Sequence, residues 1–184
     1  MERGETRLSD EAGVAALIDE LARKIRLGAK PGHPLVLIGI RSRGVPIAQR
    51  IAAKIADATG SAVPVGALDI TLYRDDLGRG NRWPVLKGTE IPFAVDGAEV
   101  VLVDDVLYTG RTVRAAIDCV CDLGRPSSVR LAVLVDRTGR ELPIQADYAG
   151  SVVAVEPGGL VRVRLRPIDP TEEIALILVV PARP

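Results

Sequence analysis

Two kinds of hydrophobic pattern alternate along the chain as far as Asp136. The first is a short and nearly unbroken apolar run, which is typical of a strand that is buried on both faces. The strands predicted in this way cover residues 35–40, 63–70, 99–103 and 129–135. The second is an apolar residue at every third or fourth position, which predicts a helix. The helices predicted in this way run from Ser9-Asp10 to Gly28, from Pro46 to about Gly60, and from Arg111 to Leu123.

Strands that alternate with helices favour a mainly parallel sheet with right-handed crossovers, so the predicted fold class is α/β. After Asp136 the pattern changes. Residues 152–155 and 160–165 flank a Glu-Pro-Gly-Gly turn and predict a β-hairpin, and residues 174–180 predict a last strand.

We expect a single domain over residues 1–184, because this length suits one hydrophobic core. The α/β core would cover about residues 30–136. The segments at about 137–184 would form a small β-rich hood together with the N-terminal helix. Residues 71–93 are charged and weakly patterned, and a loop of this length inside a compact domain is usually functional or mobile.

The composition limits the possible functions. Hydrophobic residues make up 47% of the chain, but no apolar run is long enough to span a membrane, and the polar N-terminal residues do not resemble a secretory signal. We therefore expect a cytoplasmic protein. The formal net charge is zero, so binding to nucleic acid would need a local basic patch. The single histidine, His33, cannot build a zinc site alone.

The segment from Val100 to Thr112 carries the main candidate chemistry. An apolar strand leads to Asp104 and Asp105, and a short loop with Gly110 then starts a helix. Ligands of open α/β sheets bind beyond the carboxyl ends of the strands, and a helix N-terminus favours phosphate through its N–H groups and partial positive charge. Two carboxylates would repel phosphate, so we assign them to sugar hydroxyl groups. A ribose that carries a 5-phosphate fits both parts.

Residues 39–44 form a second candidate site, because they also follow a predicted strand and precede a predicted helix. Their backbone N–H groups, together with Arg41 and Arg43, could hold a diphosphate. The alternative for this segment is a solvated basic loop. For the first segment, the alternative is that the two aspartates merely end a strand and that Thr109-Gly110 caps a helix. The whole arrangement of strand, carboxylates, loop and helix favours phosphoribose binding.

Residues 100–112 resemble the motif that binds 5-phosphoribosyl-1-pyrophosphate (PRPP) in the type I phosphoribosyltransferase family. Further blocks extend this resemblance to the bacterial regulators of pyrimidine biosynthesis (pyr) operons that are also uracil phosphoribosyltransferases. These blocks cover residues 68–77, 124–129, 131–137 and 140–150. The resemblance implies the type I phosphoribosyltransferase fold, a mainly parallel sheet flanked by helices with a small β-rich hood.

The resemblance also implies an activity and partners. Members of this family convert uracil and PRPP to UMP and pyrophosphate, with Mg²⁺ entering together with PRPP rather than through a dedicated protein site. Charged with UMP or UTP, they bind the leader mRNA of the pyr operon and promote attenuation of transcription. They assemble as homo-oligomers, either dimers or larger. A cis peptide bond is typical of the diphosphate loop, which places it here at Arg41-Ser42.

The motifs and the resemblance together assign site residues. Asp104 and Asp105 are the expected catalytic residues. The residues expected to bind PRPP or nucleotide are Arg41, Ser42, Arg43, Arg82, Asp104, Asp105, Val106, Leu107, Tyr108, Thr109, Gly110, Arg111 and Thr112. The base would lie against Asp136, Arg137 and Val161, and residues 73–87 would close over the substrate.

The evidence for RNA binding in the residues themselves is sparser. Arg23 and Arg26 on the first helix are candidate contacts, and so is Arg140, although Asp19 and Glu20 share the helix. The alternating residues Arg162, Arg164 and Arg166 could serve RNA or form a solvated edge of the hood. Because aromatic residues are few, we expect recognition through shape and arginine contacts rather than base stacking.

Three functions are therefore considered. The first is an RNA-binding attenuator that is also a uracil phosphoribosyltransferase. The second is a plain nucleobase phosphoribosyltransferase without an RNA role. The third is a regulator whose PRPP site senses nucleotides with negligible turnover. We favour the first, because several matching blocks lie outside the catalytic motif.

Overall fold

The computed structural model describes residues 3–71 and 88–179, and a parallel sheet of five strands forms its centre. The strand order is β3-β2-β4-β5-β6, and every neighbouring pair runs parallel. The bounds are Leu35–Ile40 for β2, Val65–Leu68 for β3, Glu99–Leu107 for β4, Ser128–Arg137 for β5 and Tyr148–Val153 for β6. The predicted α/β class and mainly parallel sheet are confirmed.

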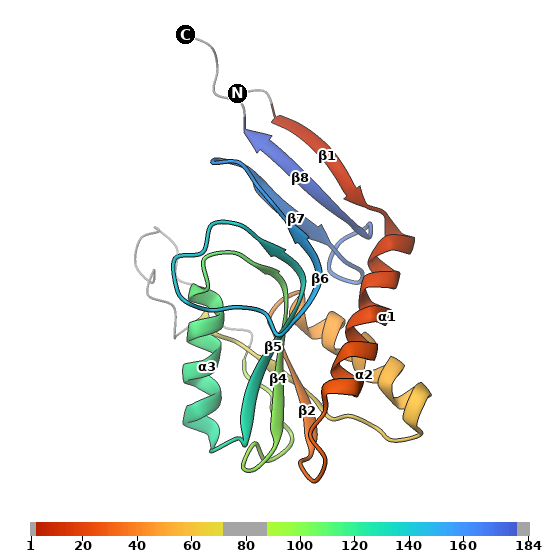
Figure 1. The fold of residues 1–184 in the computed structure, drawn as a ribbon, viewed down its shortest axis with the longest axis vertical. Helices are drawn as coiled ribbons and strands as arrows, with labels where there is room; N and C mark the ends of the chain where they lie inside the picture. The colour runs from red at the N-terminus through yellow and green to blue at the C-terminus, as the bar shows by residue number, and fades with distance from the viewer. Residues whose placement is uncertain (1–2, 72–87, 180–184) are drawn as a thin grey trace.

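Helices cover both faces of this sheet (Figure 1). Helices α1 (Glu11–Gly28) and α2 (Gly44–Thr59) lie on one face, and α3 (Arg111–Leu123) lies on the other. The side chains of β4 alternate between the two layers, so that Val101 and Val103 pack with α1 and α2 whereas Leu102 packs with α3. Because the sheet is covered on both faces, its strands consist of nearly unbroken runs of apolar residues. None of the helices in the described part of the chain is long and apolar enough to cross a membrane.

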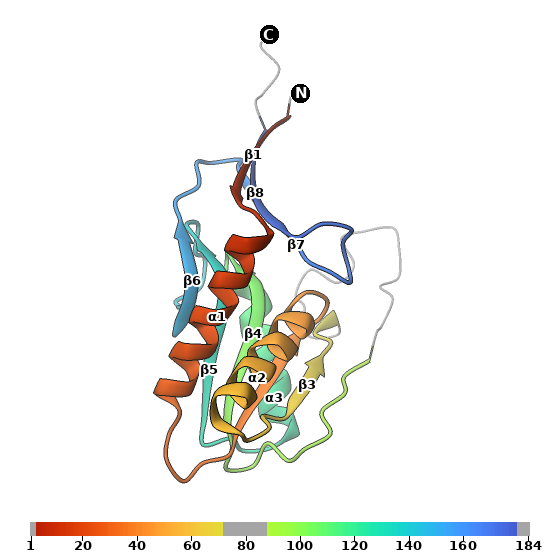
Figure 2. The same ribbon diagram turned by 90° about the vertical axis from the view of Figure 1, so that its right-hand side faces the viewer.

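A second, antiparallel sheet forms the hood. Its strands are β1 (Arg3–Ser9), β8 (Glu173–Val179) and β7 (Leu160–Arg164), in that order. This sheet stands beyond the carboxyl ends of the central strands (Figures 1 and 2). It packs onto the core through buried residues such as Val163, Leu165 and Ile174, which belong to the same hydrophobic cluster as α1 and α2.

The predicted hairpin at 152–165 is wrong. Strand β6 pairs with β5 in the central sheet, in register Ala132↔Tyr148, and β7 pairs with β8 in the hood. The turn residues 156–159 allow the chain to reverse, but they do not decide the partners of the strands on either side. Those partners come from other parts of the chain. The N-terminal strand β1, which the sequence pattern did not predict, pairs with β8 from Arg3↔Val179 onwards.

A buried polar cluster joins four elements at the amino-terminal end of the sheet. Glu99 is 1% exposed, and its Oε2 accepts a hydrogen bond of 2.7 Å from the backbone N–H of Lys30. Its Oε1 lies 3.1 Å from Nη1 of Arg130. Arg130 also donates to the carbonyl oxygen of Gly28, at 2.8 Å, and to the hydroxyl of Tyr148. The cluster thus fixes the end of α1 against β4, β5 and β6.

Candidate active site

The two aspartates of the main motif lie inside strand β4 rather than after it. The strand was expected to end at Val103, but it continues through Leu107 because residues 104–107 pair with β5. Asp104 is buried and Asp105 is half-buried. One oxygen of each carboxyl accepts a local backbone hydrogen bond of 2.9 Å, from the N–H of Asp105 and of Val106 respectively.

The surroundings of this pair disfavour its negative charge. Burial, followed by repulsion from Asp105, raises the pKa of Asp104 well above its usual value. Burial also raises the pKa of Asp105, although the hydrogen bond from Asp104 and the positive charge of Arg43 act in the opposite direction. Hydroxyl donors of a bound sugar would compensate the carboxylates for the water they have lost. The pair therefore suits a ribose better than a bare phosphate.

The expected phosphate-binding segment follows directly. Helix α3 begins at Arg111, and its N-cap is Gly110 with a φ of +93°, in the left-handed region that favours glycine. This cap residue has no side chain that could occupy the N–H groups of the first turn, although the N–H of Arg111 donates to Oγ1 of Thr109 at 3.3 Å. The N-terminus of a helix favours phosphate through such N–H groups. The carbonyl oxygen of Thr109 accepts hydrogen bonds of 3.0 Å from the N–H groups of Glu141 and Leu142, so the loop is held in place from the outside.

The loop after β2 lies against β4, the strand that carries the two aspartates. A Cβ on Gly44 would lie 2.2 Å from the carbonyl oxygen of Val103, and a Cβ on Gly39 would lie 2.5 Å from Cα of Val45. Only glycine therefore permits this approach at either position. The peptide bond Arg41-Ser42 is cis, which confirms the expectation for this loop. The loop thus reaches the residue next to Asp104, where a diphosphate and a ribose would adjoin.

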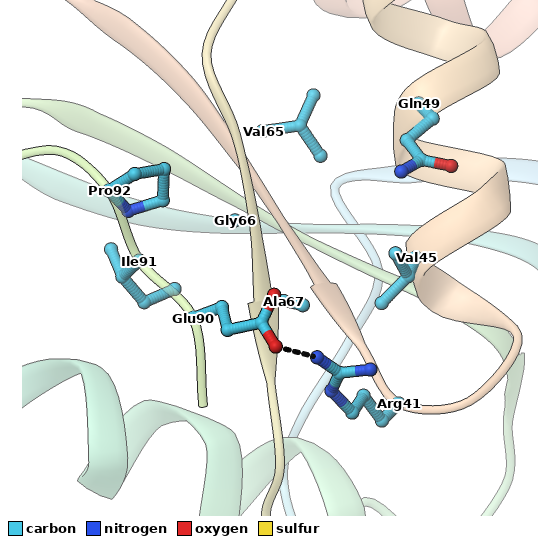
Figure 3. A pocket seen from close by; sticks show the side chains of 9 residues that line it. All are labelled: Arg41, Val45, Gln49, Val65, Gly66, Ala67, Glu90, Ile91 and Pro92. Carbon is cyan, nitrogen blue, oxygen red and sulfur yellow. Dashed lines mark ion pairs between the residues drawn. The ribbon is translucent and has the colours of Figure 1, made fainter. Parts of the chain in front are cut away.

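The two arginines of this loop point to different partners. Nε of Arg41 donates to the carbonyl oxygen of Gly88, at 2.9 Å, and its Nη2 lies 3.1 Å from Oε1 of Glu90. Arg41 thereby lines a cavity of about 590 Å³ beside β3, an edge strand of the sheet, and Figure 3 shows this cavity. Arg43 instead forms a two-point ion pair with Asp169 of the hood, at 2.9 and 2.8 Å. That both arginines bind diphosphate stays a prediction.

The end of β5 and the residues after it hold the loop of residues 108–110, which precedes α3. Arg140 forms an ion pair with Asp136 and donates to the carbonyl oxygen of Tyr108. The guanidinium of Arg137 lies 3.8 Å from the centre of the Tyr108 ring, and it donates to the carbonyl oxygen of Gly159 at 2.9 Å. Asp136 and Arg137, which were expected to contact the base, are therefore adjacent to this loop.

The remaining predicted residues are distributed more widely. The side chain of Leu107 is part of the core, so this residue could serve a ligand only through its backbone. Val161 is 5% exposed within the hood, where it pairs with Leu176. Thr112 is half-buried in the first turn of α3, and Arg111 reaches Glu141 at 2.8 Å. Arg82 and the predicted closing segment 73–87 lie outside the described residues.

The arginines considered for RNA binding are mostly engaged with acidic groups. Arg23 binds Glu20 at two points, each of 2.8 Å, and Arg140 is engaged as described above. Arg164 pairs with both Glu5 and Glu173 at 2.6 Å, and Arg166 pairs with Glu11 at 2.8 Å. Arg26 and Arg162 are exposed. Whether any of these residues binds RNA stays a prediction.

The two aspartates could help to hold a divalent cation together with substrate phosphates. In the described part of the chain, no three His, Cys, Asp or Glu side chains are grouped in a way that could hold a metal ion. Mg²⁺ in proteins is commonly held by one or two carboxylates together with substrate phosphates. Asp104 and Asp105, beside the expected phosphate-binding segment, match that requirement.

Sequence patterns did not identify the acidic partners of the site. Asp169 holds Arg43, Glu90 holds Arg41, and Glu141 holds Arg111. Each partner lies in a loop or next to one, and two of the three are more than 40 residues from the arginine that they bind. No local spacing of residues could have indicated these contacts.

Comparisons with known proteins agree with this geometry. Residues 5–162 match the family model described as a phosphoribosyl transferase domain. The chain is 51% identical to "Bifunctional protein PyrR" of Pelotomaculum thermopropionicum over 177 residues, which cover 96% of this chain and 98% of the relative. It is 56% identical to the protein of the same name from Chloroflexus aurantiacus over 143 residues, which cover 78% and 79% of the two chains.

Solved structures show the same fold. A hypoxanthine phosphoribosyltransferase from Trypanosoma cruzi, in a ternary complex with substrates, superposes with a TM-score of 0.70. The match covers 93% of this chain and 94% of the other, at 22% sequence identity. The central sheet, the flanking helices and the hood therefore form a shared architecture.

Proposed function

Since this chain belongs to the phosphoribosyltransferase family, and within it to the PyrR proteins, we propose that it transfers the phosphoribosyl group of PRPP to uracil and regulates a pyr operon. The products of the transfer are UMP and pyrophosphate. The observation that carries this half of the proposal is the meeting of a buried and a half-buried aspartate, a glycine-capped helix N-terminus and the loop 41–44 at one edge of the sheet.

The regulatory half rests on the relatives. Proteins that are 51% and 56% identical to this chain are named bifunctional, and the identity extends well beyond the phosphate-binding segment. We infer that UMP or UTP in the site enables the protein, as a homo-oligomer, to bind the leader mRNA of the operon and promote attenuation. A plain nucleobase phosphoribosyltransferase is the less favoured alternative, because it would not need this extended identity.

The proposed chemistry assigns a task to each part of the site. The first turn of α3 holds the 5-phosphate of PRPP, and the loop 41–44 holds its diphosphate. Asp104 and Asp105 accept hydrogen bonds from the ribose hydroxyls. As the bond between C1 of the ribose and the diphosphate breaks, the ring gains positive charge, and the field of the two carboxylates stabilises it. Bound Mg²⁺ would neutralise charge on the departing diphosphate.

Uracil is expected to be the preferred base. Purified protein supplied with PRPP and Mg²⁺ should release pyrophosphate with uracil, and much less with hypoxanthine or guanine. The measurement is the formation of the nucleoside monophosphate from each base, with pyrophosphate release as an independent readout. A preference for a purine would overturn the substrate assignment while leaving the PRPP site intact.

Binding to leader RNA is expected to depend on uridine nucleotide. In a filter-binding assay at moderate salt, a transcript of the organism's own pyr leader should bind more tightly when UMP or UTP is present. A transcript of the same length and shuffled sequence is the matched control, because non-specific phosphate contacts would hold both alike. If UMP changes neither transcript's binding, the regulatory half of the proposal is wrong.

A further inference from the structure

The loop between β7 and β8 forms two ion pairs with helix α2 and its N-cap residue. Asp169 binds Arg43 at the start of the helix, with Nε and Nη2 of the arginine at 2.9 and 2.8 Å from the two carboxylate oxygens. Glu172 binds Arg50, two turns further along, and its side chain is only 8% exposed. Both contacts are two-point arginine–carboxylate pairs, which are stronger and more directional than single contacts.

Only the first of these pairs lies at the proposed site. Arg43 is the N-cap of α2 and directly follows the cis peptide bond. Its charge also acts on Asp105, where it opposes the rise in the pKa of that carboxyl, which is caused mainly by burial. The guanidinium is therefore bound to the hood while its charge acts on Asp105, beside the loop proposed to hold the diphosphate.

Asp169 is itself held firmly. Its Oδ2 accepts a hydrogen bond of 2.9 Å from the N–H of Leu165, and its own N–H donates to the carbonyl oxygen of Leu165 at 2.8 Å. The hydrogen bond from Arg43 holds the pKa of Asp169 below its usual value, so the pair is charged at neutral pH. Leu165 is 1% exposed and belongs to the core. A rigid part of the hood thus determines the orientation of Arg43.

We propose that Asp169 is a positioning residue that aims the guanidinium of Arg43 at the diphosphate of PRPP, so that the hood is part of the diphosphate site. This inference rests on the proposed function. A guanidinium has five N–H donors. The contacts with Asp169 use the edge formed by Nε and Nη2, and the opposite edge, formed by Nη1 and the other N–H of Nη2, faces away from Asp169. That edge matches the spacing of two phosphate oxygens.

A competing role for Asp169 predicts the opposite effect. If Asp169 mainly neutralised Arg43, removing its charge would strengthen the binding of a diphosphate. If it positions Arg43, removing its charge would let the guanidinium rotate, and binding would weaken. The variant Asp169→Asn separates these roles, because it keeps the shape of the side chain and removes the charge.

The matched control is Glu172→Gln, which weakens the second pair of the same loop with the same helix, away from the site. For Asp169→Asn we expect the KM for PRPP and the Kd for inorganic pyrophosphate to rise by roughly 10- to 100-fold, the effect of losing one charge-assisted hydrogen bond. The value of kcat should change little. UMP, which has no diphosphate, should bind both variants as it binds the wild-type protein, and this also shows that the variants are folded.

The outcomes are distinct. Pyrophosphate affinity that is unchanged or increased in Asp169→Asn overturns the positioning role. An equal loss in Glu172→Gln overturns it as well, because the effect would then come from loosening the hood. If the wild-type protein binds neither PRPP nor UMP, the proposed function fails, and the role of Asp169 fails with it.

Discussion

Replacing Asp104 and Asp105 together by asparagine is expected to lower PRPP turnover by roughly 10²–10³-fold or more. Asparagine keeps the size of each side chain and an oxygen for the local backbone hydrogen bonds, which measure 2.9 Å in both cases. It removes the negative field that stabilises positive charge on the ribose. The measurement is the initial rate of pyrophosphate release at saturating uracil, with the PRPP concentration varied to separate kcat from KM.

The same variant should be more stable than the wild-type protein at neutral pH. The raised pKa values mean that the folded protein binds protons at these carboxyls more tightly than the unfolded chain does. As pH rises above the ordinary value of 3.8, the unfolded chain ionises first, so the free energy of unfolding falls until the folded-state pKa values have been passed. Asparagine removes this loss. Each kcal/mol recovered would raise the Tm by about 2–4 °C.

PRPP turnover and the Tm of this double variant each serve as a control for the other. The gain in Tm should be larger at pH 7 than at pH 4, because the raised pKa values make the loss of stability grow as the pH rises above 3.8. A variant that is inactive but no more stable would indicate that the activity was lost through local misfolding. Retained activity in a well-folded variant would mean that these carboxylates do not bind the ribose.

Replacing Arg130 by methionine is expected to lower the free energy of unfolding by about 3–5 kcal/mol and the Tm by roughly 6–20 °C. Methionine fills much of the same space but leaves the buried carboxylate of Glu99 without its charged partner. The carbonyl oxygen of Gly28 and the hydroxyl of Tyr148 lose a donor as well. Thermal unfolding followed by circular dichroism measures the effect.

Two further variants make this result specific. Lys54→Met removes an ion pair with Asp19 whose two side chains are both 53% exposed, and its Tm should change little. Adding Glu99→Gln to Arg130→Met should restore part of the lost stability, because the amide needs no charged partner. If the double variant is less stable than Arg130→Met alone, the buried charge is not the cause of the loss.

Apart from β6, the strands and helices of the central layers could be predicted because their patterns are local. An apolar run or a helical period is complete within one element, and β2, α2, β4, α3 and β5 all have one. Strand β1 has neither an apolar run nor a helical period, since its residues from Gly4 to Leu8 are exposed. Among the described strands it pairs with β8 alone. The turn before β7 is local too, but the pairing of β6 with β5 is not. Long-range pairing therefore accounts for the errors.

The features of the site also divide into those that a local sequence pattern could indicate and those that depend on distant segments. The aspartates, the glycine cap and the cis peptide bond belong to continuous segments, so a sequence motif could indicate them. The orientation of Arg41 and Arg43 depends on Glu90 and Asp169, which belong to distant segments. Arg140, a candidate RNA contact, donates to the carbonyl oxygen of Tyr108 in the loop before α3, a contact that depends on the packing of β5 beside β4.

The pairing of β1 with β8 has a consequence for synthesis on the ribosome. Arg7 and Glu173, which bind each other across these strands, are 166 residues apart, so the first strand of the hood emerges long before its neighbour. Strands β2 to β6 are made earlier than β8 and can assemble before β1 has a strand to pair with. The loop that carries Asp169 immediately precedes β8. A nascent chain would thus complete the strand that carries Asp104 and Asp105 first, and Asp169 would be made only shortly before β8.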